Sequence, residues 1–222
     1  MRVNNALIIS PHPDDLEIGM GGSAAKMIDG GAEVVSLVVT DGRRSTSASG
    51  LSEDQVAELR KDEVREAASI LKLHDLILLG LHDAAGDDNR IKLQDELKKA
   101  IKRFQPREIY IPHPEIDKHP THREVSRAVI DTLKEMSDAG EDIPQHVWCY
   151  EVWTPFPHYD RIEDVSHFIE FKSASINAHK SQLEYKNYTQ GILGLNRYRA
   201  VFDERHGVTD ELYAEVFIEH KL

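Results

Sequence analysis

The chain has one cysteine, Cys149, among its 222 residues. A single thiol excludes an internal disulfide framework and a four-cysteine zinc module, and it fits a reducing compartment. Long apolar runs are missing as well, since no stretch approaches the roughly 20 residues of a membrane-spanning helix. The apolar run at residues 6–9 is too short for the core of a signal peptide. We therefore expect a soluble, cytoplasmic protein.

Basic residues are also few compared with acidic residues. The chain has 27 Lys and Arg residues against 39 Asp and Glu residues, which gives a formal net charge of −12. A field of this sign repels phosphate polyanions and anionic membrane surfaces, so we expect neither nucleic acid nor a membrane as a partner. The hydrophobic content of 40% excludes a disordered chain. The length favours one domain, residues 1–222, which can fold without a metal.

Short apolar segments alternate with segments of helical periodicity. The expected strands are apolar throughout, which is typical of strands buried on both faces of a parallel sheet. These strands are residues 6–9, 33–40, 75–79, 107–111 and 146–152, and the expected helices are residues 22–29, 52–73, 92–104 and 120–136. The alternation predicts an α/β fold, Rossmann-like, with a mostly parallel sheet flanked by helices. After Pro155 the pattern is less regular.

The helix expected at residues 52–73 carries polar residues among its apolar ones. Ser52, with Gln55 three residues later, has the pattern of a capping box at the helix start. The apolar stripe expected to face the core consists of Val56, Leu59, Ala67, Ile70 and Leu71. Arg60 and Glu63 fall on or beside this stripe, so each requires a structural or functional reason.

Two clusters of potential metal ligands follow expected strands. These are Ser10-Pro11-His12-Pro13-Asp14-Asp15 after the first strand, and Asp117-Lys118-His119-Pro120-Thr121-His122 after the strand at residues 107–111. Open α/β sheets bind ligands beyond the carboxyl ends of their strands. If the two clusters meet there, His12, Asp15 and His122 supply three ligands of a tetrahedral catalytic zinc and leave the fourth position to water. Each cluster alone is equally compatible with turn and capping residues.

The two clusters are part of a longer, ordered set of motifs. The set comprises Pro11-His12-Pro13-Asp14-Asp15-Leu16-Glu17-Ile18-Gly19 with Gly21-Gly22, then Thr40-Asp41-Gly42, Arg60-Lys61-Asp62-Glu63, Leu79-Gly80-Leu81-His82-Asp83, the second cluster above, His179-Lys180-Ser181-Gln182 and Tyr213-Ala214-Glu215-Val216-Phe217. By this set the chain resembles the PIG-L/LmbE-like zinc deacetylases. That family includes enzymes that remove acetyl groups from N-acetylglucosamine moieties of glycolipids, thiol glycosides and antibiotics.

The resemblance implies a zinc-dependent deacetylase of N-acetylglucosamine-type sugars or their glycosides. His12, Asp15 and His122 would hold one zinc ion per chain, although iron or cobalt also suits two histidines and one aspartate. Asp14 would act as the general base that removes a proton from the attacking water. His119 would stabilise the oxyanion or protonate the departing amine.

The resemblance also implies supporting roles. Arg60 and Asp83 would hold sugar hydroxyls. Asp117 would keep the imidazole of His119 protonated beside the positive end of the following helix. Glu63, three residues after Arg60 on the same helix, would orient Arg60 or pack against the ligand loop. Family members often form trimers or hexamers, so we expect a homo-oligomer.

Two features depart from the family pattern. Thr121 stands where an aspartate is common, so the support of the metal ligands is expected to differ. Arg43 and Arg44 follow the second strand, where many members have an acidic residue. In a chain of net charge −12, this basic pair favours an anionic substrate if it faces the site, and otherwise it is a solvated loop.

Other interpretations stay open. A metal-dependent amidohydrolase with a non-sugar N-acyl substrate would use the same metal centre, whereas a non-catalytic carbohydrate- or nucleotide-binding domain would have no use for Asp14. The glycines at positions 19, 21 and 22 do not fit the dinucleotide-binding spacing. The aromatic residues Tyr150, Trp153, Phe156 and Tyr159 fit a sugar-stacking wall or a hydrophobic core. Cys149, in an apolar strand, is expected to be buried and inert.

Overall fold

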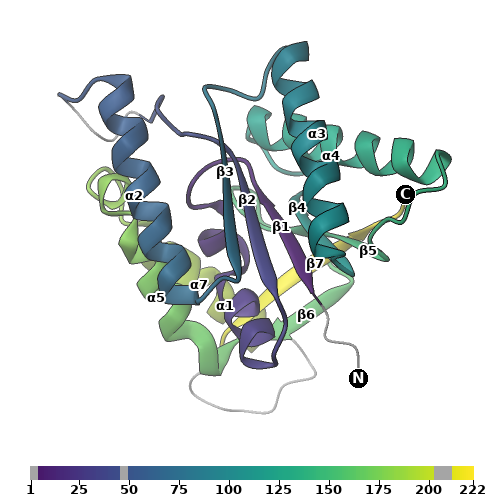
Figure 1. Ribbon diagram of the computed structural model, residues 1–222. Coiled ribbons are helices and arrows are strands. Elements are labelled where there is room, and N and C mark those ends of the chain that lie inside the picture. The colour runs from purple at the N-terminus through teal and green to yellow at the C-terminus, as the bar shows by residue number, and fades with distance from the viewer. Residues whose placement is uncertain (1–4, 46–49, 203–211) are drawn as a thin grey trace.

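The strands form one seven-stranded sheet in the computed structural model, which describes residues 5–45, 50–202 and 212–222 (Figure 1). They are β1 (Ala6–Ser10), β2 (Val34–Thr40), β3 (Asp75–Leu81), β4 (Glu108–Pro112), β5 (His146–Tyr150), β6 (Arg161–Asp164) and β7 (Ala214–His220). Their order is β3-β2-β1-β4-β5-β7-β6, and β1 to β5 run parallel. The predicted α/β fold with a mostly parallel, Rossmann-like sheet is confirmed.

The last two strands were not predicted. β7 pairs antiparallel with β5 on one side and with β6 on the other. β6 has the sequence Arg-Ile-Glu-Asp and lies at the sheet edge, half exposed, so it lacks the apolar run that marks the central strands. The sequence of β6 gives no apolar signal because its first three residues are only partly buried and its last residue is exposed.

Helices cover both faces of the sheet (Figure 1). They are α1 (Asp15–Asp29), α2 (Glu53–Leu71), α3 (Asp87–Phe104), α4 (Pro120–Asp138), α5 (Ile169–Ala178), α6 (Lys180–Leu183) and α7 (Tyr188–Val201), with a 3₁₀ turn at Ser166–Phe168. On β1, Leu7 and Ile9 belong to the core cluster that includes α3 and α4, whereas Ala6 and Ile8 belong to the cluster that includes α1. Burial on both faces explains the continuous apolar strands. Within the described ranges, no helix has the length and apolarity required to cross a membrane.

Helix α1 begins at Asp15, not at residue 22 as predicted, and it is broken at Met20, whose φ and ψ are −148° and 25°. The break frees backbone groups that a buried ion pair satisfies. The Lys172 Nζ donates to the Ile18 carbonyl at 2.8 Å, and Glu215 accepts from the Gly22 amide at 3.0 Å as well as from the next amide. The prediction was wrong because tertiary contacts outweigh the low helix propensity of three glycines.

The buried face of α2 contains Val56, Ala67 and Leu71 of the predicted stripe, but neither Leu59 nor Ile70. The capping box of Ser52 and Gln55 is confirmed. Leu59, however, is 37% exposed, whereas Arg60 and Glu63 are buried. The face that packs inward consists of Val56, Ala57, Arg60, Glu63, Val64, Ala67, Ala68 and Leu71. The two polar residues are therefore part of the packed face. Arg60 reaches the loops that follow β1 and β2, where it donates to the carbonyls of Pro13 and Gly42, whereas Glu63 contacts Ser181.

Candidate active site and metal centre

Three potential metal ligands meet beyond the carboxyl ends of β1 and β4, which are adjacent parallel strands. His12 lies in the loop after β1, Asp15 opens α1, and His122 lies in the first turn of α4. The Asp15 Oδ2 is 3.2 Å from the His12 Nδ1 and 3.2 Å from the His122 Nε2. The two ring nitrogens are 3.1 Å apart. The two clusters predicted to meet do so.

This triangle fits a tetrahedral metal. Ligands at about 2.0–2.1 Å from a zinc ion lie about 3.3–3.4 Å from one another, close to the separations of these three atoms. The second oxygen of Asp15, Oδ1, is buried and has no hydrogen-bond partner within the described structure. Asp117 Oδ2 is 3.2 Å from the His122 Nδ1, so it can hold a proton on Nδ1 and leave Nε2 for a metal ion. The donor set therefore suits a divalent cation.

Burial and ion pairing act in opposite directions on two of these groups. For Asp15, burial disfavours the charge, but His122 and then His12 together hold its pKa well below the ordinary value. For His122, burial works against the charged ring, but Asp15 and Asp117 raise its pKa to about 10. In the metal-free protein the pair is therefore an aspartate beside an imidazolium.

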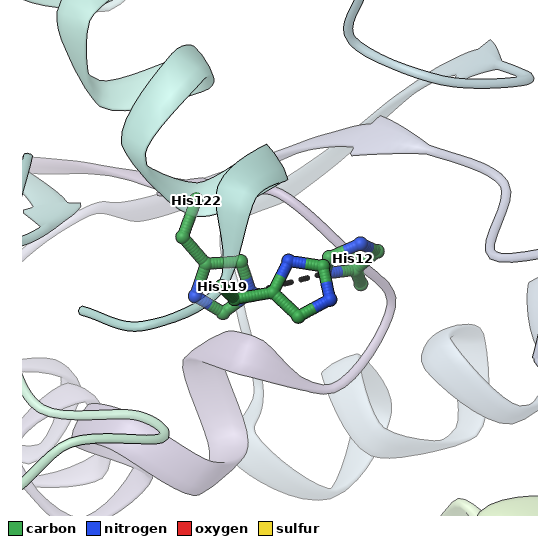
Figure 2. Close-up of side chains that lie close together, drawn as sticks. All are labelled: His12, His119 and His122. Atoms are coloured by element: carbon green, nitrogen blue, oxygen red, sulfur yellow. Dashed lines mark hydrogen bonds between the residues drawn. The ribbon is translucent and has the colours of Figure 1, made fainter.

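His119 is the third histidine of the cluster (Figure 2). A nitrogen from each of His12, His119 and His122 lies within 4.8 Å of the others, and Figure 2 shows the three rings next to one another. His119 caps α4, and its ring centroid is 4.7 Å from that of His122. Burial first, and then the neighbouring histidines, lower the pKa of His119 to about 4. The imidazole is therefore neutral at neutral pH in the metal-free protein.

The expectation that Asp117 keeps His119 protonated is wrong for this structure. Asp117 Oδ1 accepts the backbone amide of His119 at 2.8 Å, and its other oxygen binds the His122 ring. The Trp153 amide also donates to Asp117 at 3.4 Å. The turn between β4 and α4 places the Asp117 carboxylate behind the ligand His122, so it orients that ring instead of charging His119.

Asp14 is a buried carboxylate beside the cluster. It is 5% exposed, and its Oδ2 lies 3.1 Å from the Arg60 Nη2. Arg60 also donates to the carbonyl of Pro13 at 2.8 Å and to that of Gly42 at 3.3 Å. Burial raises the pKa of Asp14 despite the opposing effect of Arg60. Arg60 was expected to hold sugar hydroxyls, but its guanidinium is largely used in fixing Asp14 and two loops.

Glu63 has a different partner from the one predicted. Its carboxylate accepts the Ser181 amide at 2.6 Å and the Ser181 hydroxyl at 2.7 Å. It contacts neither Arg60 nor the loop that carries the ligands in the hydrogen bonds of the described residues. Glu63 therefore attaches the short helix α6 to α2.

Sequence reasoning assigned no role to His179. Its ring is fully buried, and its Nε2 is 3.6 Å from the Glu17 carboxylate, without a hydrogen bond in the described structure. Burial opposes protonation, but Glu17 and then Asp14 raise the pKa of His179. The motif His179-Lys180-Ser181-Gln182 was the available signal. This motif marked the segment, but it did not show that the imidazole lies close enough to Asp14 for the two charges to affect each other.

A pocket of about 550 Å³ opens over the cluster. It is lined by His12, Asp14, Thr40, Gly42, Arg44, Ser45, Arg60, His82, Asp83, His119, Thr121, Trp153, Gln182, Tyr185, Lys186 and Tyr188. Of the predicted aromatic wall, Trp153 lines the pocket, whereas Tyr150 and Phe156 are core residues. Cys149 is buried, and its burial raises its thiol pKa to about 12, so it is inert as predicted.

The two arginines after β2, Arg43 and Arg44, lie in different surroundings. Arg43 forms ion pairs with Asp41 at 2.9 Å and with Asp54 at 2.7 Å, and it is not part of the pocket lining. Arg44 lines the pocket and lies 3.2 Å from Asp83. Only the second arginine therefore faces the site.

Residues 7–133 match the family described as PIG-L, GlcNAc-PI de-N-acetylase. A diacetylchitobiose deacetylase of Thermococcus kodakarensis is 30% identical over 193 residues, which cover 81% of this chain and 70% of that protein. A probable N-acetyl-alpha-D-glucosaminyl L-malate deacetylase 2 of Bacillus cereus is 25% identical and covers 81% of this chain and 84% of its own length. The solved N,N'-diacetylchitobiose deacetylase of Pyrococcus horikoshii superposes with a TM-score of 0.81 at 26% identity, covering 99% of this chain and 84% of that one.

Proposed function

The chain belongs to the PIG-L family, and from this premise we propose that it hydrolyses the acetamido group of an N-acetylated amino sugar, of the N-acetylglucosamine type, or of its glycoside. The observation that carries this proposal is the buried Asp14 carboxylate beside the His12, Asp15 and His122 donors, at the inner end of one pocket. A binding module would have no use for such a carboxylate, because burying it costs stability.

We propose that His12, Asp15 and His122 hold one Zn²⁺ per chain. Two imidazoles and one carboxylate within 3.1–3.2 Å of one another support this assignment. When bound, the ion would polarise the amide carbonyl and lower the pKa of the attacking water. Iron or cobalt could occupy the same donors.

Asp14 is the proposed general base. Its carboxylate accepts a proton as the water oxygen bonds to the carbonyl carbon, and it returns that proton to the nitrogen as the C–N bond breaks. The products are acetic acid and the free amine, which at neutral pH become acetate and the ammonium form of the amine. Burial raises the pKa of Asp14, which brings the carboxyl closer to the working pH, where general bases are most effective. Arg60, 3.1 Å away, fixes the orientation of the carboxylate.

His119 is proposed to stabilise the charge that develops on the carbonyl oxygen. Its pKa is lowered to about 4, so it would act as a neutral hydrogen-bond donor and not as the imidazolium expected from the sequence. The ring of His119 lines the pocket, where a ring N–H could reach the carbonyl oxygen of a bound substrate. Such a donor, already in place, needs no reorganisation during the reaction.

The proposed setting is a single domain acting in the cytoplasm on a small N-acetylated sugar, without nucleic acid or a membrane. A single domain is supported by the one continuous sheet, whose first strand begins at Ala6 and whose last strand along the chain ends at His220. The net charge of −12 supports the absence of polyanionic partners. The homo-oligomer stays a prediction.

The test is release of primary amine from a panel of substrates by metal-stripped protein, with and without added Zn²⁺. The panel contains N-acetylglucosamine, diacetylchitobiose, an N-acetylglucosamine glycoside and N-acetyl amino acids. We expect zinc-dependent release from a sugar and none from the amino acids. The variant Asp14→Asn should bind Zn²⁺ normally and lose at least about 10²-fold in kcat/KM, the size of effect typical of general-base removal. Zinc-dependent release from the amino acids alone would move the substrate outside the sugars.

A further inference from the structure

The proposed reaction does not use the motif His179-Lys180-Ser181-Gln182, yet three of its four residues are buried. The motif forms the junction between α5 and α6, and α5 packs against α1 and α2 (Figure 1). His179, Ser181 and Gln182 are 0%, 5% and 7% exposed, whereas the side chain of Lys180 is 72% exposed. Burying a polar side chain costs stability unless it has partners, so the partners of these three residues indicate what the motif does.

Two of the buried residues contact the helices that carry Asp14 and Arg60. The His179 Nε2 is 3.6 Å from the Glu17 carboxylate, in the first turn of α1. Ser181 donates to the Glu63 carboxylate in α2, from its amide at 2.6 Å and from its hydroxyl at 2.7 Å. The junction between α5 and α6 is thereby attached to α1 and to α2.

The third buried residue, Gln182, contacts the loop after β2. Its side-chain oxygen accepts the Ser45 hydroxyl at 2.8 Å, and its side-chain nitrogen donates to the Ser181 hydroxyl at 2.9 Å. Ser45 in turn donates its amide to the Gly42 carbonyl at 3.0 Å. A chain of hydrogen bonds therefore runs from α2 through the motif to the loop after β2.

Arg60 joins the same three parts of the chain within the site. It extends from α2 to Asp14 at 3.1 Å and to the carbonyl of Gly42 at 3.3 Å. The approach to Gly42 is so close that a Cβ on this residue would collide with the guanidinium. In so tight an arrangement, a small shift of α1, α2 or the loop displaces the Asp14 carboxylate relative to Arg60.

Each partner of the motif stands three residues after a member of the arrangement around Arg60. The three pairs are Asp14 and Glu17, Gly42 and Ser45, and Arg60 and Glu63. Within the first pair, the chain is fixed by the Ile18 amide, which donates to the Asp14 carbonyl at 3.0 Å. The third pair spans about one turn of helix. The motif therefore holds each element about one turn away from the group that the element presents to the site.

We propose that His179, Ser181 and Gln182 are positioning residues that hold Asp14 and Arg60 in the geometry required for the proposed reaction. This inference rests on the proposed function and specifies how its general base is held. Neither His179 nor Ser181 lines the pocket, so each acts through its partner and not on the substrate. Misplacing a reacting group by about 1 Å can cost about 10²-fold in rate.

The test measures kcat and KM by amine release in the zinc-loaded full chain, with the sugar of the panel above that is hydrolysed fastest. Ser181→Ala removes the hydroxyl that Glu63 accepts. It should lower kcat about 10-fold or more and leave KM nearly unchanged, because a misplaced base weakens the chemical step and not substrate binding. Lys180→Ala is the matched control, since this residue of the same motif is exposed and lies 3.7 Å from Glu66. It should leave both constants unchanged.

His179→Phe tests the contact with α1. The variant keeps an aromatic ring and removes both ring nitrogens, and it should lower kcat by at least as much as Ser181→Ala. It also leaves the buried Glu17 without its partner, which lowers stability. Far-UV circular dichroism checks its fold. Ser181→Ala, in which the backbone amide still donates to Glu63, decides the test if His179→Phe does not fold.

The Asp14→Asn background separates positioning from general damage. If Ser181 acts by way of Asp14, then Ser181→Ala should change the residual kcat of Asp14→Asn by less than about twofold, because groups that act as a unit are not additive. The Zn²⁺ dissociation constant of Ser181→Ala, measured by competition with a chromogenic chelator, should equal that of the unmodified chain. In the described part of the chain, Ser181 is bonded to Glu63 and Gln182 and not to the proposed ligands.

The outcomes separate this inference from the proposed function. If the unmodified chain releases no amine from any sugar of the panel, the proposed function fails and this inference fails with it. If the unmodified chain is active and Ser181→Ala has the kcat of Lys180→Ala, the deacetylase stands and the positioning role is overturned. A loss of kcat that persists in the Asp14→Asn background, or that accompanies weaker Zn²⁺ binding, also overturns it.

Discussion

At the scale of single residues, the site depends on which carboxylate faces which histidine. Asp117 was predicted to serve His119, but it lies 3.2 Å from the Nδ1 of His122. Sequence spacing could not decide this, since Asp117 precedes both rings and the direction of its side chain depends on the turn into α4. That the two motifs meet was predictable, because each follows a strand of one parallel sheet.

Asp117→Asn should weaken metal binding. The amide removes the negative charge that holds the His122 proton at Nδ1 and directs Nε2 to the metal, and loss of such a partner typically costs 10–100-fold in metal affinity. The Zn²⁺ dissociation constant can be measured by competition with a chromogenic chelator. Glu115→Gln, a change of the same kind at an exposed residue nearby, is the control. Equal affinities for the two variants would refute the role of Asp117.

The pH dependence of the metal-free protein has a definite sign. The pKa of His122 is raised from 6.5 to about 10 in the folded chain. Its charged form therefore stabilises the fold fully below pH 6.5, and this contribution is lost as the pH rises towards 10. Urea unfolding of chelator-treated protein should show a lower free energy of unfolding at pH 9 than at pH 6. The variant His122→Asn, which has no titrating ring, should show a weaker decline over this interval.

At the scale of helices and strands, the sequence predicts those features that depend on neighbouring residues alone. The five parallel strands have continuous apolar runs and were found, and so was the capping box of α2. The start of α1, the inward face of α2 and the antiparallel pair β6 and β7 depend on distant partners. Arg60 and Glu63 appeared to interrupt the apolar stripe of α2. Both are buried because they have polar partners on other elements, Asp14 for Arg60 and Ser181 for Glu63.

Lys172→Met should strongly lower the free energy of unfolding, because Lys172 supports the backbone at the break in α1. It leaves the buried Glu215 without its cation and the Ile18 carbonyl without a donor, and breaking a buried pair from one side typically costs about 3–5 kcal/mol. The double variant Lys172→Met with Glu215→Gln should recover part of this loss, because no unpaired charge remains and the amide oxygen still accepts from the α1 backbone. Urea unfolding measures both. Lys61→Met, at an exposed pair, should change stability by less than about 1 kcal/mol.

At the scale of the whole molecule, the proposed metal site joins two parts of the chain that the fold already holds together. His12 and Asp15 follow β1, and His122 follows β4, and these strands pair directly. A chain of 222 residues buries about 70% of its surface on folding, so the sheet does not need the metal to form. Metal removal should therefore leave the far-UV circular dichroism unchanged and lower the melting temperature. With Zn²⁺ at about 100 times its dissociation constant, binding adds about 2.7 kcal/mol, which corresponds to about 5–10 °C for a chain of this size. His122→Asn should melt at the same temperature with and without Zn²⁺. If the stripped protein instead loses its helical signal, the metal is part of the folding core, and the two strand ends owe their proximity to the ion as well as to the sheet.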